Sequence, residues 1–105
     1  MRFSISHDHP SLPGHFPGRP IVPGVLLLQR VLEAIESAHG PLHAVRMPQV
    51  KFVQPLLPGE AAEIELQPLA GAAPERRWRF RVVRGNALLA SGEVVAPIDT
   101  VARAS

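Results

Sequence analysis

The spacing of apolar residues changes once along this chain. Residues 24–39 carry them at helical spacing, and from residue 44 onward apolar and polar positions tend to alternate, as in strands. The sequence therefore predicts one helix followed by a set of strands. The helix face expected to be mainly core consists of Val25, Leu28, Leu32 and Ile35.

The predicted helix runs from Gly24 to His39. Gly40-Pro41 ends it, since glycine is favoured just after a helix and proline cannot continue one. Its first half carries additional apolar side chains beside the core face, so that half is expected to be buried on most sides.

Five strands are expected around this helix. The sequence places them at residues 2–6, 44–54, 61–67, 76–84 and 87–96. Pro48 predicts an edge position or a bulge, because proline has no amide to donate. Residues 68–75 are expected to be a loop, and Gly85-Asn86 is a hairpin signal. The last four strands are expected to form an antiparallel meander wrapped round the helix, which is an α+β fold.

Composition narrows the class of protein. The 105 residues are expected to form one domain over residues 1–97, with a flexible tail at 98–105. The chain has no cysteine, which excludes disulfides, thiolate metal sites and thiol catalysis. It has no apolar run of membrane-spanning length and no signal-peptide pattern at its N-terminus, so a cytoplasmic protein without membrane association is expected.

Arginines alternate with apolar residues near the C-terminus. Arg77, Arg79 and Arg81 fall on one side of the strand expected at 76–84, opposite the side with Trp78 and Phe80. They indicate either a solvated strand face, which we favour, or a basic landing surface for an acidic carrier protein. Nucleic acid is not an expected partner, because the net charge is only +2 and the aromatic residues point inward.

The residues best suited to chemistry precede the helix. Residues 14–33 read GHFPGRPIVPGVLLLQRVLE, in which prolines and glycines stiffen a loop that presents His15. A histidine can move protons near neutral pH, and the first free amides of a helix can bind a developing oxyanion. His7 and His9 flank Asp8, but adjacent side chains point apart, so solvent exposure is favoured over a metal site. No metal and no cofactor is expected.

Two segments of the chain resemble a known family. The run HFPGRPIVPGVL, from His15 to Leu26, resembles the signature of the 3-hydroxyacyl-acyl-carrier-protein dehydratases, the FabZ/FabA-like hotdog-fold enzymes of fatty-acid elongation. The block KFVQPLLPGE, from Lys51 to Glu60, also looks like part of that family. The resemblance implies a hotdog fold, an antiparallel sheet wrapped round one central helix. It also implies a short form without the N-terminal helix of longer members, like relatives in polyketide-like or aryl-polyene pathways.

The resemblance also implies partners and site residues. It implies a dimer with two sites at the interface, formed by two copies or with a dehydratase paralogue, and it leaves higher oligomers open. Each site takes an acyl chain on acyl carrier protein or on coenzyme A. His15 matches the catalytic histidine, and Gly24 matches the glycine whose amide polarises the thioester carbonyl. Phe16 is a candidate for a second amide, and Val25 for a substrate contact.

Gln29 occupies the position of the family's carboxylate. Dehydration removes a Cα proton and protonates the leaving hydroxyl, and a glutamine amide can orient groups but cannot release a proton. Three hypotheses follow: His15 acts alone while Gln29 positions the substrate, a paralogous subunit supplies the carboxylate, or the protein binds acyl chains without turnover. A hotdog thioesterase is a further alternative. The favoured interpretation is a 3-hydroxyacyl-thioester dehydratase, a hydro-lyase that gives the 2-enoyl thioester.

Overall fold

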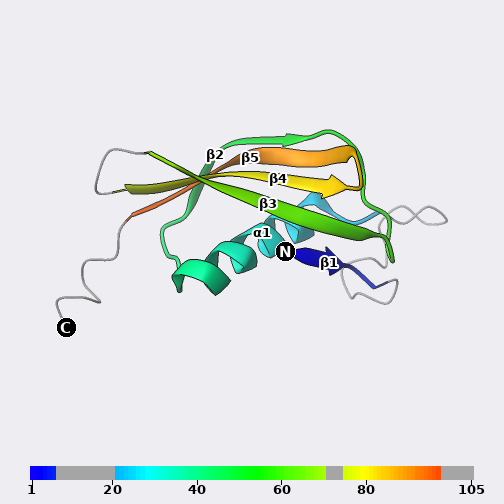
Figure 1. Ribbon diagram of the computed structural model, residues 1–105, viewed down its shortest axis with the longest axis horizontal. Coiled ribbons are helices and arrows are strands. Elements are labelled where there is room, and N and C mark those ends of the chain that lie inside the picture. The colour runs from blue at the N-terminus through cyan, green and yellow to red at the C-terminus, as the bar shows by residue number, and fades with distance from the viewer. Residues whose placement is uncertain (7–20, 71–74, 98–105) are drawn as a thin grey trace.

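A computed structural model of the protein describes residues 1–6, 21–70 and 75–97. Within these ranges a five-stranded antiparallel sheet packs over one helix (Figure 1). The elements are β1 (Arg2–Ser4), α1 (Gly24–His39), β2 (Arg46–Phe52), β3 (Ala61–Leu69), β4 (Glu75–Arg84) and β5 (Ala87–Pro97). The predicted α+β arrangement is confirmed. The predicted tail at 98–105 lies outside the described residues.

The helix α1 has the bounds that the sequence predicts. It ends before Gly40, whose φ of 88° suits glycine and whose amide donates to the Glu36 carbonyl oxygen at 2.8 Å. The helix residues buried in the core are Leu26, Leu27, Val31, Ala34 and Ile35. No helix in the described ranges is long and apolar enough to cross a membrane.

The predicted core face of α1 is wrong in part. Ile35 is buried, but Val25 is 59% exposed, and Leu28 and Leu32 are only partly buried at the margin of the core. The first half of the helix is apolar nearly all round, whereas the sheet covers only one side of it. Residues 1–6, 21–70 and 75–97 therefore leave the side of α1 with Val25 uncovered.

The strand order is β1-β3-β4-β5-β2. The strands β3, β4 and β5 form the expected meander, with β3 running on through Leu69 and β4 starting at Glu75, so the predicted loop at 68–75 is shorter.

The predicted place of β2 is wrong, because β2 pairs with β5 instead of β3. The cause is the connection over residues 53–60, which crosses the end of the sheet. Its Val53 amide donates to Leu89 of β5 at 2.7 Å, and its Gly59 amide donates to Ile5, beyond β1, at 2.8 Å.

The strand β2 is an edge strand with an irregularity, as Pro48 predicts. Its register against β5 shifts between Arg46 and Gln49. Beyond the shift, Gly92 of β5 lets β2 approach closely. A Cβ atom at Gly92 would lie 2.1 Å from the Gln49 carbonyl oxygen and 2.9 Å from the Phe80 ring. This close approach brings the end of β2, and Phe52 with it, over the helix.

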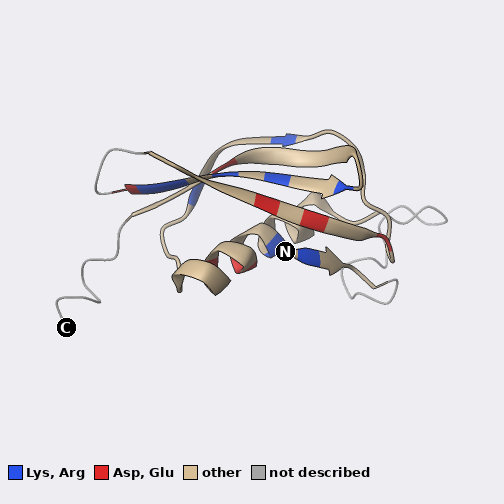
Figure 2. Cartoon of the chain, viewed as in Figure 1, with Lys and Arg blue, Asp and Glu red and all other residues tan. Residues whose placement is uncertain are grey.

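The outer face of the sheet carries matched charges. Arg77 pairs with Glu93 at 3.0 Å, and Arg81 pairs with Glu65 at 2.9 Å. Trp78 and Phe80 are buried on the other side of β4, as predicted. Figure 2 shows basic residues on β4 beside acidic residues on β3. Because glutamates neutralise much of the arginine row, the structure favours a solvated strand face over a basic landing surface.

Candidate functional site

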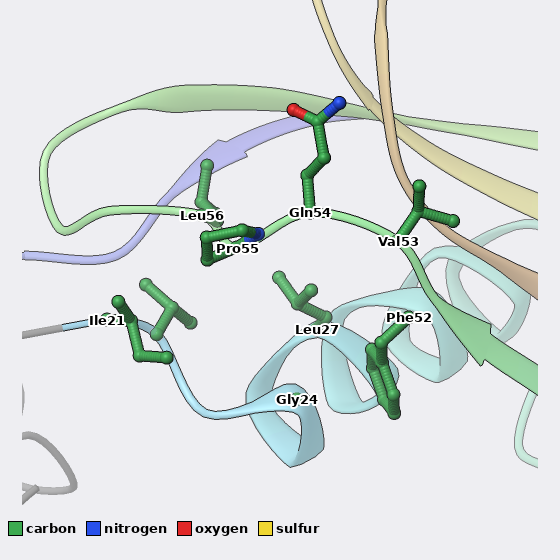
Figure 3. A pocket seen from close by; sticks show the side chains of 9 residues that line it. Ile21, Gly24, Leu27, Phe52, Val53, Gln54, Pro55 and Leu56 are labelled. Atoms are coloured by element: carbon green, nitrogen blue, oxygen red, sulfur yellow. The ribbon is translucent and has the colours of Figure 1, made fainter.

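An apolar cavity of about 340 Å³ lies at the start of α1 (Figure 3). Its walls come from the chain that enters α1 and the first turn of that helix, and from the end of β2 and the segment that follows it. They consist of Ile21, Val22, Gly24, Leu27, Phe52, Val53, Gln54, Pro55 and Leu56. The Gln54 side chain points away from the helix, so the interior is formed mainly by hydrocarbon and backbone groups. Such a cavity has the size and lining of a small-molecule site.

The first amides of α1 are open toward a ligand. Pro23 caps the helix without a side-chain hydrogen bond, and the first turn has no acidic residue. The Leu26 amide already donates to the Pro23 carbonyl oxygen at 3.0 Å. Within the described residues, the amides of Gly24 and Val25 have no acceptor. A helix N-terminus with free amides stabilises negative charge, and Gly24 at this N-terminus lines the cavity.

Gly24 also makes room for an aromatic ring. A Cβ atom at this position would lie 2.7 Å from Cζ of Phe52, so any side chain there would displace the ring. Phe52 is 53% exposed at the end of β2, and its ring stands beside the helix start (Figure 3). The glycine therefore lets the ring close one side of the cavity at the helix start.

The variant Gly24→Ala is expected to push the Phe52 ring aside and distort the cavity. Because the ring is half exposed and can move, we expect little loss of thermal stability but an affinity for octanoyl-pantetheine about tenfold lower. Calorimetric titration and thermal melting measure the two effects. The double variant Gly24→Ala/Phe52→Leu should regain affinity relative to Gly24→Ala, with Phe52→Leu as its reference. Wild-type affinity in Gly24→Ala would contradict the role of this contact.

The structure brings only some of the predicted site residues to the cavity. Gly24 lines it, whereas Val25 and Gln29 do not. Both are exposed and four residues apart, so they share the uncovered face of α1. His15 and Phe16 lie outside the described residues, and their roles stay predictions.

The end of β2 and the segment after it form one wall of the cavity, and the sequence patterns did not assign this wall to the site. The block KFVQPLLPGE contains Phe52, Pro55 and Leu56, and its likeness to a family motif was the available signal. A contact between this block and the helix start could not be predicted from local sequence patterns. In the fold, the Val22 amide donates to the Leu56 carbonyl oxygen at 2.8 Å and joins the two walls.

The described residues offer no metal centre. No group of three or more histidine, aspartate or glutamate side chains suited to a metal ion occurs in residues 1–6, 21–70 and 75–97. His7, Asp8 and His9 lie outside these ranges.

Comparison with known protein families agrees with the sequence motif at His15–Leu26 and with the fold. Residues 1–93 match the ApeI-like family, described as ApeI dehydratase. The chain belongs to the ApeI-like dehydratase family. It is also 31% identical to the 3-hydroxyacyl-[acyl-carrier-protein] dehydratase FabZ of Magnetococcus marinus, over 94% of this chain and 67% of that protein. The FabZ-like resemblance is confirmed, and the function of the chain is dehydratase-like.

Solved structures confirm the hotdog fold. A probable thioesterase from Bartonella henselae superposes with a TM-score of 0.72 at 13% identity, over 92% of this chain and 85% of the other. The dehydratase heterocomplex ApeI:P from Xenorhabdus doucetiae gives a TM-score of 0.67 at 19% identity, over 91% of this chain and 83% of that chain. At these identities the likeness establishes the fold alone.

Proposed function

We propose that the protein removes water from a 3-hydroxyacyl thioester and releases the 2-enoyl thioester. The observation that carries this proposal is the apolar cavity at the open N-terminus of α1, which can hold an acyl chain with its thioester carbonyl at the Gly24 amide. Membership of the ApeI-like dehydratase family supports the same reaction. The proposed carrier is acyl carrier protein, as in the name of the Magnetococcus relative, with coenzyme A as the alternative. The proposed location is the cytoplasm.

The proposed mechanism uses one proton carrier. His15 takes the proton from C2 of the substrate, and the electron pair moves onto the thioester oxygen, which accepts hydrogen bonds from the Gly24 amide and from the candidate second amide, Phe16. When the pair returns, the C2–C3 double bond forms and the C3–O bond breaks. The departing hydroxyl takes the proton back from His15 and leaves as water, so no proton is gained or lost. Gln29 orients that hydroxyl by hydrogen bonding.

We propose that a second subunit covers the site. Val25, Phe52 and Val53 are 59%, 53% and 44% exposed. Val25 is the second residue of α1, and the Phe52 ring at the end of β2 stands beside the helix start (Figure 3). The strand β2 is also a sheet edge. Exposed apolar side chains beside an unpaired edge favour association with another chain. In such a dimer, Gln29 on the uncovered face of α1 would serve the site of the opposite subunit.

A second candidate is a subunit that needs a different partner for turnover. Gln29 favours it, because an amide stands where the family has a carboxylic acid. A paralogue with that carboxylate would complete a site around His15 of this chain and leave the reciprocal site without an acid. The Xenorhabdus structure, a dehydratase heterocomplex, makes this arrangement worth testing.

The test is turnover of 3-hydroxyoctanoyl thioester on acyl carrier protein and on pantetheine. We expect the purified protein to form the octenoyl thioester, followed by its absorbance and by the loss of one water in mass. Activity only after co-expression with a carboxylate-bearing paralogue would support the second candidate. Release of free 3-hydroxy acid would show hydrolysis of the thioester, and the protein would then be a thioesterase instead of a dehydratase. No reaction in any of these mixtures, with no thioester binding, would contradict the proposed function.

A further inference from the structure

We propose that Arg84 is a positioning residue for the acyl cavity, although it does not line the cavity. Arg84 is the last residue of β4, and it binds three acceptors in the segment over residues 54–60. We name this arrangement the Arg84 clamp. It consists of Arg84, the Glu60 and Gln54 side chains and the Pro55 carbonyl group. The proposal rests on the proposed function, because it takes the cavity as the acyl site.

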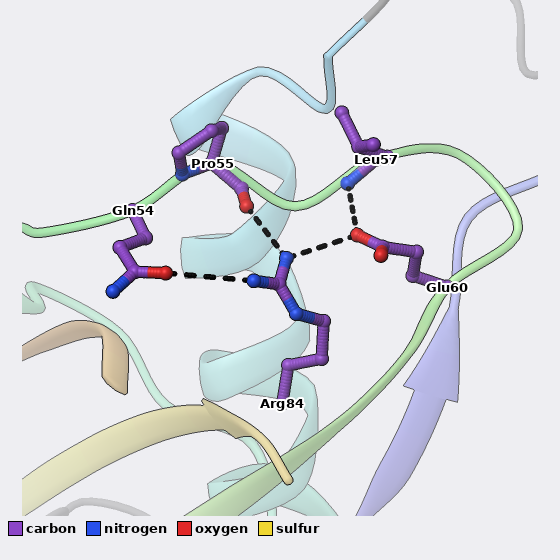
Figure 4. A network of polar contacts seen from close by, with 5 residues as sticks. All are labelled: Gln54, Pro55, Leu57, Glu60 and Arg84. Atoms are coloured by element: carbon purple, nitrogen blue, oxygen red, sulfur yellow. Dashed lines mark hydrogen bonds and ion pairs between the residues drawn. The ribbon is translucent and has the colours of Figure 1, made fainter. Parts of the chain in front are cut away.

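The clamp holds both ends of the segment at once (Figure 4). Nη1 of Arg84 donates to the Pro55 carbonyl oxygen and to Oε1 of Glu60, both at 3.0 Å, and Nη2 donates to Oε1 of Gln54 at 3.4 Å. The rigid guanidinium fork suits several acceptors at fixed directions better than an ammonium group. Oε1 of Glu60 also accepts the Leu57 amide at 2.9 Å. One carboxylate oxygen thus connects the arginine to the middle of the segment.

The clamp connects to the helix start through the cavity wall. Between its two ends lies Leu56, which is fully buried and lines the cavity. The Leu56 carbonyl oxygen accepts the Val22 amide at 2.8 Å, just before Pro23 and Gly24. A movement of the segment would therefore shift Leu56 and Val22 relative to the Gly24 amide.

Another ion pair on β4, between Arg81 and Glu65, provides a contrast. Arg81 and Glu65 lie on two strands that are already joined by ladder hydrogen bonds, and both side chains are 52% exposed. Arg84 and Glu60 are 31% and 35% exposed, and they fix residues 54–60, all of which lie between β2 and β3, outside any strand. Removing Arg84 should loosen the wall and leave the sheet paired, whereas removing Arg81 should leave both the wall and the sheet pairing unchanged.

The experiment compares Arg84→Met with the matched control Arg81→Met in the full chain. Both substitutions keep an apolar stem and remove the charged donors. We expect amide hydrogen exchange at Val22 and Leu57 to be about tenfold faster in Arg84→Met, because the charge-assisted hydrogen bonds that hold residues 54–60 in place are lost. Exchange in β3, β4 and β5 should stay as in the wild type. Arg81→Met should leave Val22 and Leu57 unchanged.

The same proteins are titrated with octanoyl-pantetheine, which has no hydroxyl to eliminate. We expect affinity about tenfold lower in Arg84→Met, wild-type affinity in Arg81→Met and partial recovery in Arg84→Lys. For dehydration, KM should rise more than kcat falls. Unchanged exchange at Val22 and Leu57, or equal loss of affinity in both methionine variants, would overturn the proposal. If the wild-type protein binds thioester but does not dehydrate it, the proposed function fails while the exchange and affinity results still decide the role of Arg84.

Discussion

The variant His15→Ala is expected to lower kcat/KM for dehydration of 3-hydroxyoctanoyl-pantetheine by about 10²- to 10⁴-fold, the usual contribution of a positioned acid–base group. In the proposed mechanism one imidazole both removes the C2 proton and returns it to the hydroxyl, so its loss affects both transfers. Binding should survive, because the described walls of the cavity come from residues 21–27 and 52–56. Initial rates and titration with octanoyl-pantetheine measure the two quantities separately.

A second histidine provides the control. His43 is exposed in the connection after α1, away from the cavity walls, and His43→Ala should keep wild-type kinetics. An unchanged rate in His15→Ala would remove His15 from the mechanism. A loss of affinity as large as the loss of rate would assign His15 to binding instead of proton transfer.

Local sequence signals predicted the elements well because they depend on neighbouring residues. The bounds of α1 follow from Gly24 at one end and Gly40-Pro41 at the other, and the structure has the same bounds. Pro48 indicated an edge or a bulge, and β2 is an edge strand with a register shift there. Each of these signals acts through backbone hydrogen bonding within a few residues.

Long-range placement was less predictable. The alternation of apolar and polar residues in β2 would be the same whether β2 paired with β3 or with β5. The partner of β2 therefore depends on the path of residues 53–60 across the end of the sheet. The same path carries Phe52 and Leu56 to the helix start, and for this reason the sequence indicated Gly24 but not the opposite wall. Likewise, helical spacing put Val25 on the predicted core face and could not show that the sheet leaves this residue uncovered.

The exposure of Gln29 connects the fold to the chemistry. In a single chain Gln29 points neither into the core nor into the cavity, so its side chain is not needed for packing. The effect of Gln29→Glu on the rate can therefore be attributed to the reaction and not to a change in helix stability, because glutamate and glutamine have similar helix propensities. Glu33 lies four residues further along the helix, and the added repulsion should cost only about 0.2–0.5 kcal/mol.

The variant Gln29→Glu is expected to raise kcat/KM for dehydration at least about 10²-fold, because a carboxylic acid in a covered site can protonate the leaving hydroxyl while His15 removes the C2 proton. The rate of enoyl formation by the purified variant measures the gain. Ser37→Glu is the matched control, since it adds a carboxylate at an exposed position near the end of the same helix and should leave the rate unchanged. A gain in Gln29→Glu would place residue 29 of one subunit at the reacting atoms of the other. Unchanged turnover with intact octanoyl-pantetheine binding would contradict that placement and favour a subunit whose acid comes from a paralogue.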